Sequence, residues 1–116
     1  MLSRPEFPIG VFDSGIGGLT VARALMQRLP NEHILYFGDT ARVPYGVKSA
    51  DTIAQYAIQI TDFLLERQVK LLIVACNTMA AVAAGAIRAR SPVPVLDVIE
   101  VGARVAAQST RNRRIG

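Results

Sequence analysis

The central part of the chain reads Leu71-Leu72-Ile73-Val74-Ala75-Cys76-Asn77-Thr78 and continues into the alanine-rich segment Met79–Ala86. A short apolar run is typical of a strand buried on both faces, and the polar residues after it indicate a sharp turn into a helix. Cys76 is the only cysteine. Unpaired N–H groups and the positive dipole end at a helix N-terminus favour thiolate over thiol. The segment predicts a reactive thiol at a strand–helix turn, and a cysteine that only packs in the core is the alternative.

Short apolar runs and amphipathic segments alternate along the rest of the chain. We expect strands at Pro8–Asp13, His33–Phe37, Leu71–Ala75 and Val95–Val98. We expect helices at Leu19–Leu29, from an N-cap at Ser49 to about Arg67, at Thr78–Arg90 and at Glu100–Ser109, with a fifth strand beginning at Arg114. This alternation predicts an α/β fold, an open parallel sheet of flavodoxin-like or Rossmann-like βα repeats with helices on both faces.

Polar clusters follow three of the expected strands. They are Asp13-Ser14, Asp39–Gly46 and Cys76-Asn77-Thr78. Ligands of parallel sheets bind outside the carboxyl ends of the strands. The sequence therefore predicts a small-molecule site that combines a thiol, two carboxylates and several hydroxyl groups at one edge of the sheet.

Each residue of these clusters has a structural alternative. Asp13 either helps to cap the next helix, or orients a substrate ammonium and tunes the thiol's proton affinity. Asn77 and Thr78 cap the third helix, bind a substrate carboxylate beside its N–H groups, or do both. Tyr45 either belongs to a simple turn or closes over a small ligand.

Composition limits the class of protein. The 116 residues are 51% hydrophobic and 19% charged, which indicates one globular domain and excludes a disordered chain. One cysteine and one histidine provide neither a disulfide framework nor a zinc site, so we expect no metal and a reducing, cytoplasmic compartment. Met1–Pro8 lacks the apolar core of a signal peptide, and no run approaches the ~20 residues of a membrane span.

Two further features indicate ligands only weakly. Gly15-Ile16-Gly17-Gly18 lacks the last glycine of a dinucleotide fingerprint because position 20 is Thr20. The net charge of +4 gathers near the C-terminus, at Arg104, Arg111, Arg113 and Arg114. We interpret these arginines as a solvated helix end in preference to a nucleic-acid arm.

Three motifs resemble, in order, those of the glutamate racemase family. Phe12–Val21 resembles the opening motif, Gly38–Gly46 with Lys48-Ser49 looks like the second, and Ala75–Thr78 is similar to the first catalytic-cysteine motif. The resemblance runs from about Ile9 to Gly116. It implies cofactor-independent interconversion of L- and D-glutamate by two thiols, which supplies D-glutamate for peptidoglycan.

The resemblance also implies roles for individual residues. Cys76 exchanges the α-proton on the D-glutamate side, and the residues that contact the substrate or assist proton transfer are Asp13, Ser14, Tyr45, Gly46, Asn77 and Thr78. Racemisation needs a second acid/base on the opposite face of the carbon, and the family supplies it as a second cysteine in a later half. We therefore expect residues 1–98 to form an N-terminal lobe, and residues 99–116 a crossover helix and the start of a second lobe.

We expect this chain alone to be inactive, and the complete protein to be a homodimer that binds glutamate but neither a membrane nor nucleic acid. A related racemase acting on aspartate or hydantoin-like substrates is the nearest alternative. A nonenzymatic module that binds an anion or nucleic acid, through the glycine turn and the basic tail, is the second.

Overall fold

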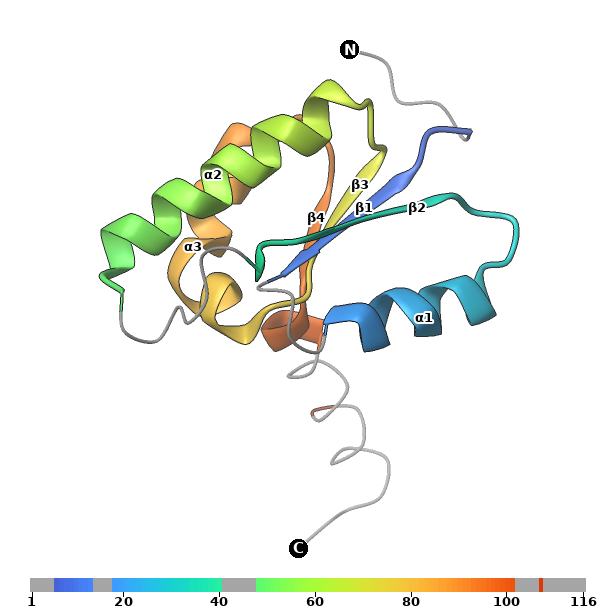
Figure 1. Cartoon of the computed structure of the whole chain (residues 1–116), viewed down its shortest axis with the longest axis horizontal. Helices are drawn as coiled ribbons and strands as arrows, with labels where there is room; N and C mark the ends of the chain where they lie inside the picture. The colour runs from blue at the N-terminus through green and yellow to red at the C-terminus, as the bar shows by residue number, and fades with distance from the viewer. Residues whose placement is uncertain (1–5, 14–17, 41–47, 102–106, 108–116) are drawn as a thin grey trace, which may run out of the picture.

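The structure is a computed structural model that describes residues 6–13, 18–40, 48–101 and 107. In this part of the chain the strands are β1 (Ile9–Asp13), β2 (Ile34–Gly38), β3 (Leu71–Val74) and β4 (Val95–Asp97). The helices are α1 (Gly18–Arg28), α2 (Ala50–Glu66) and α3 (Asn77–Arg90). The strands form one parallel sheet in the order β2-β1-β3-β4 (Figure 1). The predicted α/β fold is confirmed, and the strand order is that of flavodoxin-like sheets.

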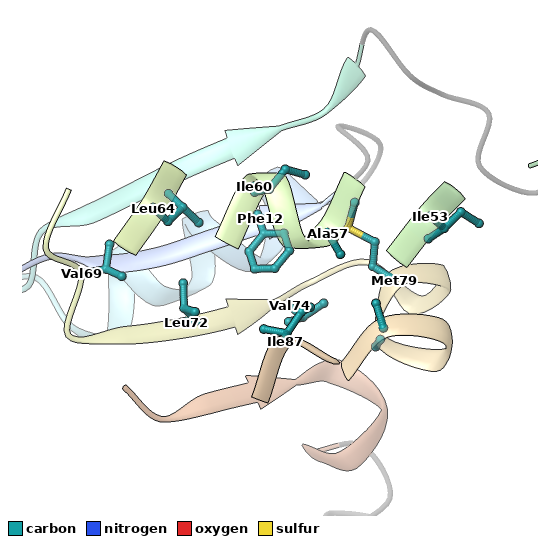
Figure 2. Close-up of a cluster of buried hydrophobic side chains, with 12 residues drawn as sticks. Phe12, Ile53, Ala57, Ile60, Leu64, Val69, Leu72, Val74, Met79 and Ile87 are labelled. Atoms are coloured by element: carbon teal, nitrogen blue, oxygen red, sulfur yellow. The ribbon is translucent and has the colours of Figure 1, made fainter. Parts of the chain in front are cut away.

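Helices cover both faces of the sheet, as predicted. Figure 1 shows α2 and α3 together on one side and α1 on the other. Side chains of a strand alternate between the faces, so Phe12 joins the larger core under α2 and α3, and Val11 the smaller core under α1. Figure 2 shows the larger core, in which Phe12, Leu72 and Val74 meet side chains of the two covering helices. The strands are thus fixed from both sides, which fixes the positions of their ends.

Local sequence determines how closely α2 packs and where it begins. The Ser49 hydroxyl accepts a hydrogen bond from the Thr52 N–H at 3.1 Å, so the predicted N-cap is confirmed. A Cβ at Gly10 would lie 3.1 Å from a Val69 methyl and 3.4 Å from a Leu64 methyl. Glycine in β1 therefore allows α2 and the loop after it to approach the sheet.

The end of the chain is only partly described. Residues Val98–Val101 are helical, so the turn after β4 begins two residues earlier than predicted. The rest of the expected helix Glu100–Ser109, apart from Ala107, and the strand expected at Arg114 lie outside the described residues. Within the described ranges, no helix combines the length and the apolarity that crossing a bilayer requires.

Candidate active site

The strand order places a topological switch point between β1 and β3. From β1 the chain passes through α1 to β2 on one side of the sheet, and from β3 it passes through α3 to β4 on the other. The two connections leave in opposite directions over opposite faces (Figure 1). Ligands of open α/β sheets bind outside the carboxyl ends of the strands at such a switch point. Asp13 is the last residue of β1 and Cys76 lies two residues after β3, so these two residues follow the two strands that flank the switch point.

Backbone hydrogen bonds hold the three strand ends side by side. The Asp39 N–H donates to the Asp13 carbonyl at 2.9 Å, and the Ala75 N–H donates to the Phe12 carbonyl at 2.9 Å. The end of β1 is therefore fixed between the residues that follow β2 and β3. The backbone thus brings Asp13 beside Asp39 and places Ala75, the residue before Cys76, beside the end of β1.

Cys76 occupies the N-cap position of α3. Its backbone is extended, with φ −97° and ψ 123°, and its carbonyl accepts a hydrogen bond from the Ala80 N–H at 2.9 Å. The residue is half-buried and packs against the edge of the larger core. The backbone N–H groups of the first helical turn precede the first intrahelical bond, so an anion bound there would be stabilised. The thiol is thus neither sealed in the core nor fully exposed, and it lies where a helix stabilises negative charge.

Asn77 and Thr78 are the first two residues of α3, which begins one residue earlier than predicted. The N-cap is the residue whose side chain can reach back to the N–H groups of the first turn, and here it is Cys76. The expectation that Asn77 and Thr78 cap the helix is therefore wrong. Asn77 is exposed and Thr78 half-buried at the same strand end.

Asp13 is only 1% exposed, and its carboxylate is held by a residue that sequence reasoning missed. The Tyr36 hydroxyl donates a hydrogen bond to Asp13 Oδ1 at 2.8 Å. Burial, this hydrogen bond and the charge of Asp13 together raise the pKa of Tyr36 to about 12. Tyr36 therefore stays protonated, and stays a donor, at neutral pH.

Asp39 is 6% exposed and lies at the same sheet edge as Asp13, on the face that α2 covers. With Phe37 and Phe63 it lines a cavity of about 170 Å³ at the junction of β2 and α2. Asp13, by contrast, contacts Tyr36, which packs against the core under α1. The two carboxylates share the sheet edge but lie toward opposite faces, Asp13 on the α1 side and Asp39 on the α2 side.

Asp97 ends β4 and is a second residue that sequence reasoning missed. It is 4% exposed and accepts hydrogen bonds from Arg88 Nη2 and the Glu100 N–H, both at 2.8 Å. Burial acts to raise the pKa of this carboxyl, but the bond from Glu100 and the bond and charge of Arg88 outweigh it and leave the pKa below its usual value. Through these two bonds, Asp97 links the helical turn after β4 to α3.

The remaining predicted contacts, Ser14, Tyr45 and Gly46, lie outside the described residues. Within residues 6–13, 18–40 and 48–101, no three His, Cys, Asp or Glu side chains gather closely enough to ligate a metal ion.

The sequence matches the family described as Asp/Glu/Hydantoin racemase over residues 10–116. The chain belongs to this family. It is 71% identical over 115 residues to the glutamate racemase of Syntrophus aciditrophicus strain SB. It is 64% identical over 110 residues to that of Neisseria meningitidis strain MC58.

Solved structures of the family share the fold. The glutamate racemase of Francisella tularensis, in complex with D-glutamate, aligns with a TM-score of 0.82 at 51% identity over 86% of this chain. The Aquifex pyrophilus enzyme aligns with a TM-score of 0.85 at 46% identity over 91% of this chain. The chain spans 43% of the Syntrophus relative and 38% of the Francisella chain, so it corresponds to the N-terminal part of these racemases.

Proposed function

We propose that this chain is the N-terminal lobe of a cofactor-independent racemase that interconverts L- and D-glutamate by two-base proton transfer. One observation carries the proposal. Cys76 lies at the N-cap of α3, directly after β3, and the buried Asp13 ends the neighbouring strand β1, so the two residues follow the strands on either side of the switch point. Membership of the racemase family and 71% identity to a relative named glutamate racemase support the choice of reaction and substrate.

The proposed chemistry begins at the thiol. The α-proton of an amino acid is very weakly acidic, so its removal needs a base held against the carbon in a site that excludes water. Cys76 as thiolate takes the α-proton of D-glutamate, and the electron pair of the C–H bond delocalises toward the substrate carboxylate. The N-terminus of α3 favours negative charge beside this carboxylate as well as on the sulfur.

The residues around Cys76 orient the substrate. Asn77 and Thr78, with the N–H groups of the first turn of α3, receive the α-carboxylate. Asp13 attracts the ammonium group and assists proton transfer at Cys76. Ser14, Tyr45 and Gly46 complete the substrate contacts.

A second acid/base must reprotonate the planar carbon from the opposite face. Cys76 is the only cysteine here, so in this proposal the second thiol belongs to sequence beyond these 116 residues. Residues 1–98 form the lobe that carries the first base, and residues 99–116 lead into the second lobe. The complete protein acts in the cytoplasm as a homodimer and supplies D-glutamate for peptidoglycan.

A chimera tests this function directly. The matched N-terminal region of the Syntrophus aciditrophicus racemase is replaced by residues 1–116 of this chain, so that the relative supplies the remainder. Racemisation is followed from each enantiomer of glutamate by circular dichroism. We expect the chimera to racemise glutamate, the 116-residue chain alone to be inactive, and Cys76→Ser to lower kcat at least ~100-fold. Ala81→Ser, an exposed position on the same helix, is the matched control and leaves kcat unchanged.

The same chimera is assayed with aspartate and with a hydantoin. Faster turnover of either compound than of glutamate would contradict the proposed substrate while retaining the chemistry. A Cys76→Ser chimera as active as its parent would contradict the chemistry itself.

A further inference from the structure

We propose that Tyr36 is a positioning residue for the reaction, which sets the orientation of the Asp13 carboxylate through a hydrogen bond from its hydroxyl. The inference rests on the proposed function, in which Asp13 acts on the substrate and on Cys76. Tyr36 lies in the middle of β2, outside the three clusters that the sequence places at the strand ends.

Among the described side chains, only that of Asp13 accepts a hydrogen bond from the Tyr36 hydroxyl. In the parallel register Tyr36 pairs with Val11, so its side chain shares a face with those of Val11 and Asp13. Its ring packs against the smaller core of Ile9, Val11 and Ile73. From there the hydroxyl reaches Asp13 Oδ1 at 2.8 Å. A ring packed against the core thus places its hydroxyl at the sheet edge.

The hydrogen bond from Tyr36 adds a constraint on the Asp13 carboxylate that the strand backbone does not supply. The backbone of Asp13 is held on both sides, by the Asp39 N–H at its own carbonyl and by the Ala75 N–H at the preceding one. These bonds fix Cα and Cβ, but rotation of a carboxylate about its terminal bond has only broad minima. A hydrogen bond to Oδ1 fixes that rotation and therefore the position of Oδ2. Functional groups are held this way when their supporting residues are themselves locked by packing.

The bond is of the strong, charge-assisted kind. A neutral phenol donates to an ionised carboxylate, and such bonds are stronger than those between two neutral groups. The pKa of Tyr36, raised to about 12 by burial and by Asp13, keeps the phenol protonated. The donor is therefore present throughout the pH range in which a cytoplasmic racemase would act.

Tyr36→Phe in the chimera is the test, since it removes one oxygen and leaves the packed ring. We expect kcat to fall about tenfold, because a misplaced functional group loses much of its effect. KM for glutamate should change less than about threefold because the other substrate contacts remain. Thr61→Val is the matched control, since it removes another buried hydroxyl, which donates to the Ala57 carbonyl at 2.7 Å in α2. We expect Thr61→Val to leave kcat unchanged.

A double-mutant cycle separates positioning from a general structural loss. In a chimera that carries Asp13→Ala, adding Tyr36→Phe should change kcat no further, because the group that Tyr36 orients is gone. A tenfold additional loss in that background would contradict positioning. If Cys76→Ser abolishes activity but Tyr36→Phe leaves kcat unchanged, this inference fails and the proposed function stands. If Cys76→Ser has no effect, the proposed function fails first.

A spectroscopic titration of the 116-residue chain gives an independent readout. Tyrosinate absorbance is followed against pH for the parent chain, for Asp13→Asn and for Tyr36→Phe, which identifies the Tyr36 step by difference. Asp13→Asn removes the negative charge, so the pKa of Tyr36 should fall toward its ordinary value near 10. An unchanged Tyr36 titration in Asp13→Asn would overturn the contact on which the inference depends.

Discussion

Asp13 and Asp97 end two strands of the same sheet, and both are almost completely buried, with 1% and 4% exposure. They are held in different ways. Asp97 is fixed by the guanidinium of Arg88 and by a backbone N–H from the turn that follows it. Tyr36 holds Asp13 through a neutral hydroxyl, which orients the carboxylate without adding a positive charge.

The two arrangements suit different tasks. A buried carboxylate bonded to a cation joins the segments that supply its partners, and Asp97 joins α3 to the turn after β4. The bond from Tyr36 to Asp13 comes from a neutral donor, so this bond orients the carboxylate without compensating its charge. Asp13 also borders the switch point between β1 and β3, whereas Asp97 lies at the last described strand. We therefore propose that Asp13 takes part in the chemistry and that Asp97 is structural.

The largest expected effect separates the two aspartates by activity. In the chimera, Asp13→Asn should lower kcat at least ~100-fold, because the substituted amide neither attracts an ammonium group nor assists proton transfer. Asp97→Asn should change kcat less than about threefold, because it lies outside the reacting groups. Both values come from initial rates of glutamate racemisation at saturating substrate. Equal losses in the two variants would break the distinction.

The next effect concerns the thiol at the N-cap of α3. We expect iodoacetamide to alkylate native Cys76 at least ~10 times faster than a buried thiol, because Cys76 is half-exposed at a helix N-terminus. The buried reference thiol comes from a double variant of this chain, Cys76→Ser with Ala83→Cys. Its cysteine replaces Ala83, which lies in the same helix and is 0% exposed. Alkylation is followed by mass spectrometry. Equal rates would mean that Cys76 is a core residue.

The smallest effect is the stability that Asp97 contributes. Asp97→Asn should lower the free energy of unfolding by about 1 kcal/mol at neutral pH, because the hydrogen bonds to the charged group are weakened. The folded pKa of Asp97 is lowered, so this contribution is present above the unfolded value near 3.9 and is lost as pH falls through the folded value. Urea unfolding at several pH values should therefore show the two proteins converging in acid.

Asp62→Asn is the matched control for that comparison. Asp62 forms an ion pair with Arg90 on the exposed side of α2 and α3, with 2.5 Å between Oδ1 and Nε. Exposed pairs contribute little because water and salt screen them. A loss for Asp62→Asn as large as that for Asp97→Asn would remove the structural role assigned to the buried aspartate.

Much of the fold could be predicted from local patterns. Apolar runs located the four described strands. A serine directly before an amphipathic segment located the N-cap of α2 at Ser49. Helix α3 begins at Asn77, one residue before the predicted start at Thr78. A helix start depends on backbone geometry, which the side-chain pattern does not encode. The patterns left the strand order open between flavodoxin-like and Rossmann-like repeats, and the structure has the flavodoxin-like order.

The site was only partly predictable for the same physical reason. Asp13 and Cys76 stood out because they follow apolar runs directly. Tyr36 and Asp97 looked like ordinary strand residues, since their roles depend on contacts across the sheet and between elements. Tyr36 meets Asp13 only because β1 and β2 pair in a register that sets Tyr36 opposite Val11. The period of two along a strand would have identified it once that register was known.

Exchange of the α-proton with solvent tests most directly whether the thiol at the β3–α3 turn is the base for D-glutamate. The chimera and its Cys76→Ser variant are incubated with D-glutamate in D₂O, and loss of the α-proton signal is followed by NMR. We predict rapid exchange in the chimera and exchange at least ~100-fold slower in the variant. Exchange at the parent rate without the Cys76 sulfur would contradict the central role assigned to this residue.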